Sequence, residues 1–184
     1  MGLKVLNGGL QTTLQASPRI GFRHKGCPAS GPADGLSHAL ANRLVGNAFD
    51  AAALEITLSG ICVAFTADCH IAITGGEAGI TINSRPSDSH STLFVKSGDI
   101  LETGPITKGA RIYLAIEGGI ASEDWLGSGS TYLPATLGGY HGRQLRPNDE
   151  LILSSKSNTS TSGNPPSTPI DLSLIHISEP TRPY

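Results

Sequence analysis

The sequence has few charged and few aromatic side chains. Asp, Glu, Lys and Arg make up 15% of the 184 residues, and Phe, Trp and Tyr make up 5%. The formal net charge is −2, and Lys and Arg form no basic stripe. Because nucleic-acid binding depends on basic patches and aromatic stacking, we expect no nucleic-acid partner.

Long hydrophobic runs are also missing. No stretch reaches the roughly 18 apolar residues of a membrane-spanning helix, so we expect no membrane partner. The first residues, MGLKVLNGGLQTT, lack the apolar segment of a secretory signal peptide. The three cysteines form no Cys-x-x-Cys pair, so we expect reduced thiols and a cytoplasmic protein. Cys62 and Cys69 lie in apolar runs and are expected in the core, whereas Cys27 lies in a turn-rich segment.

Metal-ligand spacing is absent as well. The six histidines are spread along the chain, and none takes part in a His-x-His, His-x-x-x-His or Cys-His cluster. The sequence therefore predicts no metal site.

Short apolar runs separated by Gly, Pro, Asn or Asp dominate what is present. Strands are expected at 3–6, 10–15, 53–58, 61–65, 69–74, 79–82, 92–95, 99–103, 111–116 and 150–154. The Gly-rich stretch 75–79 is interpreted as a hairpin turn. This spacing predicts a mainly β fold, an antiparallel barrel or sandwich.

A single main α-helix is predicted over about residues 35–46, within GPADGLSHALANRLVGN. One face at helical spacing is apolar: Leu36, Ala39, Leu40, Leu44 and Val45. Asp34 is a favourable N-cap, and Gly46 is a favourable residue beyond the C-cap. Catalysis is the alternative role for Asp34, because a capping carboxylate keeps a second oxygen for a ligand.

Residues 16–34 form a long irregular segment rich in Gly, Pro, Ser and Arg, and loops of this length are usually functional or disordered. Polar side chains gather in it and in the strand before it: Gln11, Thr12, Thr13, Arg19, Arg23, His24 and Asp34. Arg binds carboxylates through two hydrogen bonds, and Gln or Thr orients an amide. The segment could thus bind a small amide or carboxylate substrate, but a solvated loop explains the same composition.

A second Gly- and Ser-rich stretch is GSGSTYLPATLGG at 127–139. It lacks the Gly-Lys-Ser/Thr ending of a phosphate-binding P-loop. Its backbone N–H groups and hydroxyls could hold a carboxylate or another oxyanion, and a flexible surface loop is the alternative.

The C-terminal part has a different composition. Residues 154–169 contain no large apolar side chain, which predicts a disordered linker over 154–171. SLIHISEPTR, in the last residues, resembles translated adapter sequence at the broken ends of assembled sequences. We therefore expect a folded domain at 1–153 and a non-native tail at 172–184.

Several long motifs follow one another in a fixed order over about residues 5–153. They are GLQTTLQ, SGPAD, ANRLVGN, AALEITLSG, IAITGG, YLAIEGGI, GSGSTYLPATLGGYHGRQL and NDEL. Together they resemble the KipA-like family, which includes biotin-dependent carboxyltransferase subdomains, allophanate hydrolase subunit 2 and the C-type subunit of 5-oxoprolinase. The resemblance implies a cyclophilin-like antiparallel β-barrel. It covers the N-terminal half of the family pattern, which implies that this chain is inactive as an isolated fragment.

The function implied by the resemblance is that of one component of an ATP-dependent 5-oxoprolinase complex, which converts 5-oxoproline to glutamate. Its implied partners are a KipI-like protein and a protein like the A-type subunit of 5-oxoprolinase. One alternative is the carboxyltransferase component of a biotin-dependent urea carboxylase and allophanate pathway. Another is a regulatory module that binds a KipI-like protein without catalysis. We expect no cofactor on this chain alone: ATP is used by the complex, and biotin arrives on a partner because no Met-Lys-Met motif is present.

Site residues follow from the same resemblance. The implied catalytic residues are Asp34, Arg19, Gln11 and Thr12. The implied substrate-binding positions are Ser30, Gly31, Asn42, Asn47, Glu55, Ser128, Ser130, Thr131, Gly138, Gly139 and Arg143. The family's acidic residue after Gln15 is replaced here by Ala16, so no role is expected for that acid.

Overall fold

The computed structural model describes residues 2–154. The remainder of the linker expected over 154–171 and the tail expected at 172–184 lie outside the described residues. Among the residues described, no helix has the length and hydrophobicity needed to cross a membrane.

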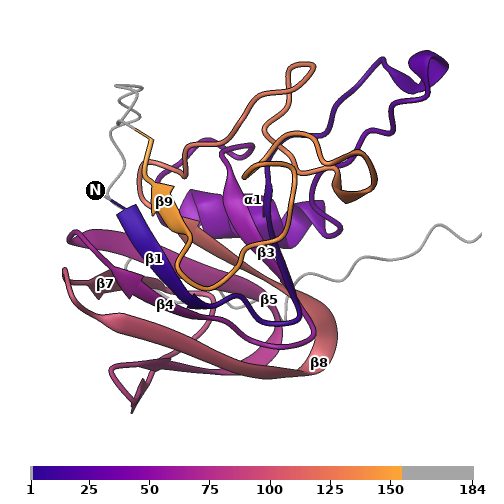
Figure 1. The fold of residues 1–184 in the computed structure, drawn as a ribbon. Coiled ribbons are helices and arrows are strands. Elements are labelled where there is room, and N and C mark those ends of the chain that lie inside the picture. The colour runs from indigo at the N-terminus through magenta and orange to yellow at the C-terminus, as the bar shows by residue number, and fades with distance from the viewer. Residues whose placement is uncertain (1, 155–184) are drawn as a thin grey trace, which may run out of the picture.

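The described chain is mainly β, as predicted, and has one α-helix. The strands are β1 (Gly2–Asn7), β2 (Gln11–Gln15), β3 (Ala53–Thr57), β4 (Cys62–Phe65), β5 (Cys69–Ile82), β6 (Arg85–Pro86), β7 (Thr92–Val95), β8 (Ile100–Ile116) and β9 (Glu150–Ile152). The helix is α1 (Gly35–Leu44), and two short 3-10 helices are η1 (Arg23–Lys25) and η2 (Leu133–Ala135). Figure 1 shows the antiparallel sheet curled on itself, with α1 on one side of it.

Strand β8 holds the sheet together. One of its edges pairs with β5 along most of its length, and the other edge pairs first with β4 and then with β3. The two strands expected at 69–74 and 79–82 form one long strand, β5, so the turn predicted at 75–79 is wrong. The two strands expected at 99–103 and 111–116 likewise form one long strand, β8. The register shifts between Gly75 and Ile80, so β-bulges bend β5 where a turn was expected.

Two cores lie on the two faces of the sheet. Ile112, Leu114 and Ile116 of β8 point into the larger core, whereas Tyr113 and Ala115 belong to the cluster under α1. The alternation follows from the two-residue repeat of a strand. Small side chains cover the sheet under the helix and let it approach closely: Ala53, Ala72 and Ala115.

The helix begins where predicted, but the face that it buries matches the predicted one only in part. Leu36 is 60% exposed, and the buried residues are His38, Ala41, Asn42 and Leu44. The predicted apolar face is therefore confirmed at its C-terminal end, where Leu44 and Val45 are buried and Leu40 is partly buried, and it is wrong for Leu36. The polar side chains are satisfied there: the His38 ring lies 3.0 Å from the Gln15 carbonyl oxygen, and Asn42 donates to the Ala51 carbonyl at 2.9 Å.

The helix ends two residues earlier than predicted. Val45 is the C-cap, and Gly46 follows with φ +76°, which confirms its expected place beyond the cap. Cys69 is buried as expected, whereas Cys62 is only half-buried.

Candidate functional site

A row of polar side chains crosses four strands beneath the N-terminal end of α1. Thr13 of β2 lies opposite Glu55 of β3, Glu55 lies opposite Tyr113 of β8, and Tyr113 lies opposite Thr74 of β5. Directly opposed residues share one face of an antiparallel sheet, so the four side chains form a continuous row. All four are buried.

The Glu55 carboxylate is the centre of this row. Its Oε2 accepts hydrogen bonds from the Tyr113 hydroxyl at 2.8 Å and from the Ala33 N–H at 2.7 Å. Its Oε1 accepts from Arg111 Nε at 3.2 Å. A buried carboxylate needs such donors, because an unpaired charge is costly away from water. Burial and the adjacent Glu55 carboxylate raise the pKa of Tyr113, so its hydroxyl remains a donor.

The same row fixes the start of α1. The Asp34 N–H donates to the Tyr113 hydroxyl oxygen at 2.8 Å, and Thr74 Oγ1 donates to the Ser37 carbonyl at 2.6 Å. The Asp34 carboxylate accepts from the Ser37 N–H at 3.0 Å and from Ser37 Oγ at 2.6 Å, which confirms the N-cap. Both of its oxygens therefore have a partner, yet the side chain is exposed to solvent. Its catalytic role stays a prediction.

Hydroxyl groups from residues 128–131 hold the segment that follows β2. Ser128 Oγ donates to the Ser17 carbonyl at 2.6 Å, Ser130 Oγ donates to the Ala16 carbonyl at 2.8 Å, and Thr131 Oγ1 donates to the Leu14 carbonyl at 2.8 Å. The three side chains are buried. Their hydroxyls thus act on the protein's own backbone, and the predicted substrate contacts remain predictions.

Arg19 anchors the base of the loop between β2 and α1. The residue is 1% exposed, and its guanidinium lies 4.7 Å from the centre of the Trp125 ring. Nε donates to the Trp125 carbonyl at 2.9 Å, and Nη2 donates to the Ser130 carbonyl at 2.7 Å. Burial lowers the pKa of Arg19, opposed by the nearby Cys27 and Asp124.

Gly138 makes this close approach possible. Its φ is +68°, and a Cβ there would lie 2.5 Å from the Ser130 carbonyl oxygen and 3.2 Å from Arg19 Nη2. Gly139 has the same constraint against the Thr131 side chain. These two signature glycines therefore have a packing role in this fold.

Two of the predicted residues, Asn47 and Arg143, lie apart from these groups. Asn47 follows α1 at its C-terminal end, about 15 Å from Asp34 along a helix of this length. It donates to Asn42 Oδ1 at 3.0 Å and to the Ile116 carbonyl at 2.8 Å. Arg143 forms a two-bond ion pair with Asp149 at 2.7 and 2.8 Å, which lowers the pKa of Asp149.

Four further predicted positions lie near the loop and β2. Thr12 Oγ1 donates to the Gly8 carbonyl at 2.8 Å, and Gln11 is half-buried on the same strand. Ser30 and Gly31 have φ of 52° and 94°, so both lie in left-handed backbone just before α1. The structure thus brings Ser30, Gly31, Asp34 and Glu55 to one end of α1.

Sequence reasoning missed Tyr113, Arg111 and Gln15. Tyr113 lies in an apolar run, RIYLAI, where the strand alternation places it on the opposite face from Ile112 and Leu114. That alternation was the available signal. Gln15 lies in the GLQTTLQ motif, and its Oε1 is buried with no hydrogen-bond partner among residues 2–154.

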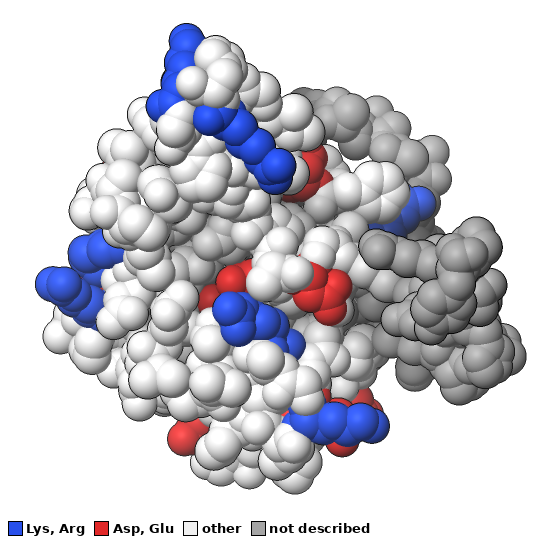
Figure 2. Space-filling view, turned by 90° about the vertical axis from the view of Figure 1, so that its right-hand side faces the viewer, with Lys and Arg blue, Asp and Glu red and all other residues white. Residues whose placement is uncertain are grey.

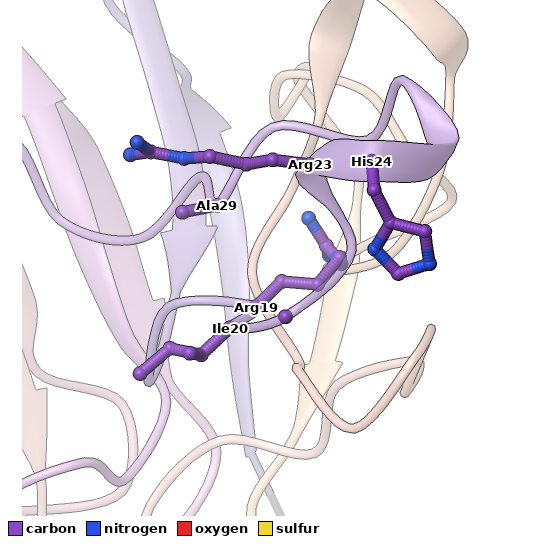
Figure 3. Close-up of a pocket in the computed structure, with 6 residues that line it drawn as sticks. Arg19, Ile20, Arg23, His24 and Ala29 are labelled. Carbon is purple, nitrogen blue, oxygen red and sulfur yellow. The ribbon is translucent and has the colours of Figure 1, made fainter.

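The loop between β2 and α1 protrudes from the protein and contains a hollow. Figure 2 shows Lys and Arg side chains gathered at the top of the face, where the loop projects. The hollow has a volume of about 370 Å³ and is lined by Arg19, Ile20, Gly21, Arg23, His24 and Ala29 (Figure 3). A second hollow, of about 460 Å³, is lined by Arg23, Gly26, Cys27, Pro28, Ala29 and Tyr132, so it shares two lining residues with the first.

The structural neighbours of this curled antiparallel sheet with its single helix are carboxyltransferase domains. The family model "Carboxyltransferase domain, subdomain A and B" matches residues 25–180. The chain belongs to this family.

Known proteins from two groups are similar to the chain. The urea amidolyase of Saccharomyces cerevisiae is 42% identical over 173 residues, which is 93% of this chain and 9% of that protein. The C-type subunit of the Escherichia coli 5-oxoprolinase is 38% identical over 149 residues, which is 81% of this chain and 48% of that protein. The crystal structure of the K. lactis urea amidolyase superposes with a TM-score of 0.86 at 40% identity, over 91% of this chain and 10% of that one. The chain thus spans from about a tenth to about half of the length of these relatives.

Proposed function

We propose that this chain supplies part of the carboxyltransferase site of a biotin-dependent urea carboxylase. The observation that carries the proposal is the agreement with urea amidolyases in both sequence and structure, at 42% identity and a TM-score of 0.86. Urea is a small planar amide, and the end of α1 offers an exposed carboxylate, Asp34, beside the buried Glu55. A cytoplasmic location is part of this proposal.

Biotin does not fit the described residues by themselves. Its bicyclic ring needs an enclosed slot, whereas the two hollows beside the loop are open to solvent and both are lined in part by Arg23. The carrier of biotin, and the walls that hold its ring, therefore belong to other parts of the enzyme in this proposal.

A second candidate is a component of the ATP-dependent 5-oxoprolinase complex. It is favoured by the 48% share of the Escherichia coli C-type subunit that this chain covers, a larger share than of any urea enzyme described above. In this case the partners are a KipI-like protein and a protein like the A-type subunit, and ATP is used by the complex. Capture of a KipI-like protein without any effect on 5-oxoproline would indicate the regulatory alternative.

Segment exchange distinguishes the two enzymes. Residues 2–154 replace the matching segment in the Saccharomyces cerevisiae urea amidolyase and, separately, in the C-type subunit of the Escherichia coli 5-oxoprolinase. We expect urea-dependent ATP consumption to survive in the first hybrid and glutamate release from 5-oxoproline to be lost in the second. The reverse result would establish the second candidate. Loss of both activities in hybrids that fold would contradict both.

The Asp34→Asn variant tests the predicted role of this carboxylate. Asn caps a helix nearly as well as Asp, so the free energy of unfolding should change by less than about 0.5 kcal/mol. We expect activity of the hybrid enzyme to fall by at least roughly tenfold if the charge acts on substrate, which is about 1.4 kcal/mol. Unchanged activity would leave Asp34 with its capping role alone. Ser37→Ala, which removes only the hydroxyl that binds Asp34 Oδ2, is the matched control.

A further inference from the structure

The loop between β2 and α1 projects from the body of the protein (Figure 1). Its two arms are joined at the base, where the Arg19 N–H donates to the Ala29 carbonyl at 2.6 Å. Residues 16–33 contain no Asp or Glu, but they contain Arg19, Arg23, His24 and Lys25. The last three of these are exposed on η1. The loop is therefore a cationic projection.

One donor in this loop is left without a partner. Arg19 Nη1 is buried and makes no hydrogen bond within the described residues, although Nε and Nη2 both do. A guanidinium carries its charge at all ordinary pH values, so Nη1 always has hydrogens to donate. Leaving a buried donor unpaired is costly. The positive charge of the loop and a donor without a partner, Arg19 Nη1, thus occur in the same segment.

The hollow of about 370 Å³ is lined by Arg19 together with Arg23 and His24. In Figure 3, Arg23 extends past Ala29, while His24 descends on the other side of the loop and Arg19 lies between them. Asp124 acts electrostatically on Arg19, and it is the acid that partly balances the charge there. Two Arg against one Asp leave an excess of positive charge.

We propose that this loop hollow binds a small oxyanion, a carboxylate or phosphate group, between Arg19, Arg23 and His24. Arg recognises both groups through charge-assisted hydrogen bonds. The anion offsets the cost of burying the Arg19 charge and gives Nη1 an acceptor. It is either a free anion or an acidic side chain of a partner protein. This inference goes beyond the proposed function, because it requires neither urea nor 5-oxoproline.

The test is a titration of the full chain with inorganic phosphate or acetate, followed by the backbone amide NMR signals of residues 19–29. We expect saturable shifts confined to this loop. In the double variant Arg23→Gln/His24→Gln, the Kd should rise roughly tenfold or more, since charge-assisted contacts are lost. Lys25→Gln is the matched control, because Lys25 is exposed on η1 but does not line the hollow. Its Kd should change less than roughly twofold.

A hexaglutamate peptide separates the two sources of the anion. Binding of phosphate or acetate with the expected dependence on Arg23 and His24 indicates a free anion. Binding of the peptide alone, with the same dependence, indicates an acidic partner side chain. No saturable shift with any of the three probes would overturn the proposal. An equal loss in the Lys25→Gln control would also overturn it, because it would show attraction by net charge alone.

Discussion

Tyr113 links the buried carboxylate of the candidate site to the start of α1 through one hydroxyl group. That group donates to Glu55 and accepts from the Asp34 N–H. The Tyr113→Phe variant leaves both partners without their hydrogen bond. We expect the free energy of unfolding, measured with urea, to fall by about 1–3 kcal/mol.

The control for this variant is Tyr132→Phe. Tyr132 is half-buried, and no hydrogen bond of its hydroxyl is seen within residues 2–154. Its loss should change stability by less than about 0.5 kcal/mol. Equal effects of the two substitutions would contradict the linking role of Tyr113.

The burial of His38 should make the stability of the protein depend on pH. Burial lowers its pKa below the ordinary 6.5, so the folded protein keeps the ring neutral where the unfolded chain already binds a proton. Stability should therefore fall as the pH drops below about 6.5. Burial also lowers the pKa of His90, so His38→Gln and His90→Gln are compared with the parent in urea unfolding at several pH values. A slope as steep as the parent's in both variants would argue against this origin.

Capping was predictable from the sequence, and the hydroxyl contacts were not. Asp34 caps a residue only three positions away, so the pattern of neighbouring residues contains the information. Ser130 donates to a carbonyl 114 residues earlier in the chain. Nothing in the local pattern of GSGSTYLPATLGG distinguishes a hydroxyl that binds a ligand from one that binds distant backbone.

Among the elements, β5 depends on one glycine in its bend. Gly75 has φ +100°, and a Cβ there would lie 2.6 Å from the Arg111 carbonyl oxygen of β8. Gly75→Ala should lower the free energy of unfolding by about 1–3 kcal/mol, because both the backbone conformation and the close contact oppose a side chain.

Gly79 on the same strand provides the comparison. A Cβ at Gly79 meets nothing within 4 Å, and its φ lies outside the left-handed region. Gly79→Ala should leave the urea midpoint nearly unchanged. If Gly75→Ala and Gly79→Ala lower the free energy of unfolding equally, the bend at Gly75 does not explain the loss of stability.

The type of each element could be predicted better than its length or its buried face. Apolar alternation located the strands, but the Gly residues of 75–79 are equally typical of a turn and of a bulge. Pairing with a continuous β8 decides between them, and that pairing is not local. The buried face of α1 was predicted only in part, because His38 and Asn42 find backbone carbonyl partners that a hydrophobic pattern does not represent.

At the scale of the whole molecule, the domain boundary at residue 153 stays a prediction. The last strand within residues 2–154 is β9, which ends at Ile152 and pairs with β1. Limited proteolysis followed by mass spectrometry should give a resistant fragment that ends close to residue 153. A resistant fragment that extends beyond residue 171 would contradict the boundary.

The hydroxyl contacts at the loop base also constrain the order of folding. The partners of Ser17, Ala16 and Leu14 lie 111, 114 and 117 residues further along the chain. During synthesis, the N-terminal segment therefore emerges from the ribosome long before the groups that hold it exist. Contacts this distant in sequence form slowly, so the cationic projection should be among the last parts of the protein to become ordered.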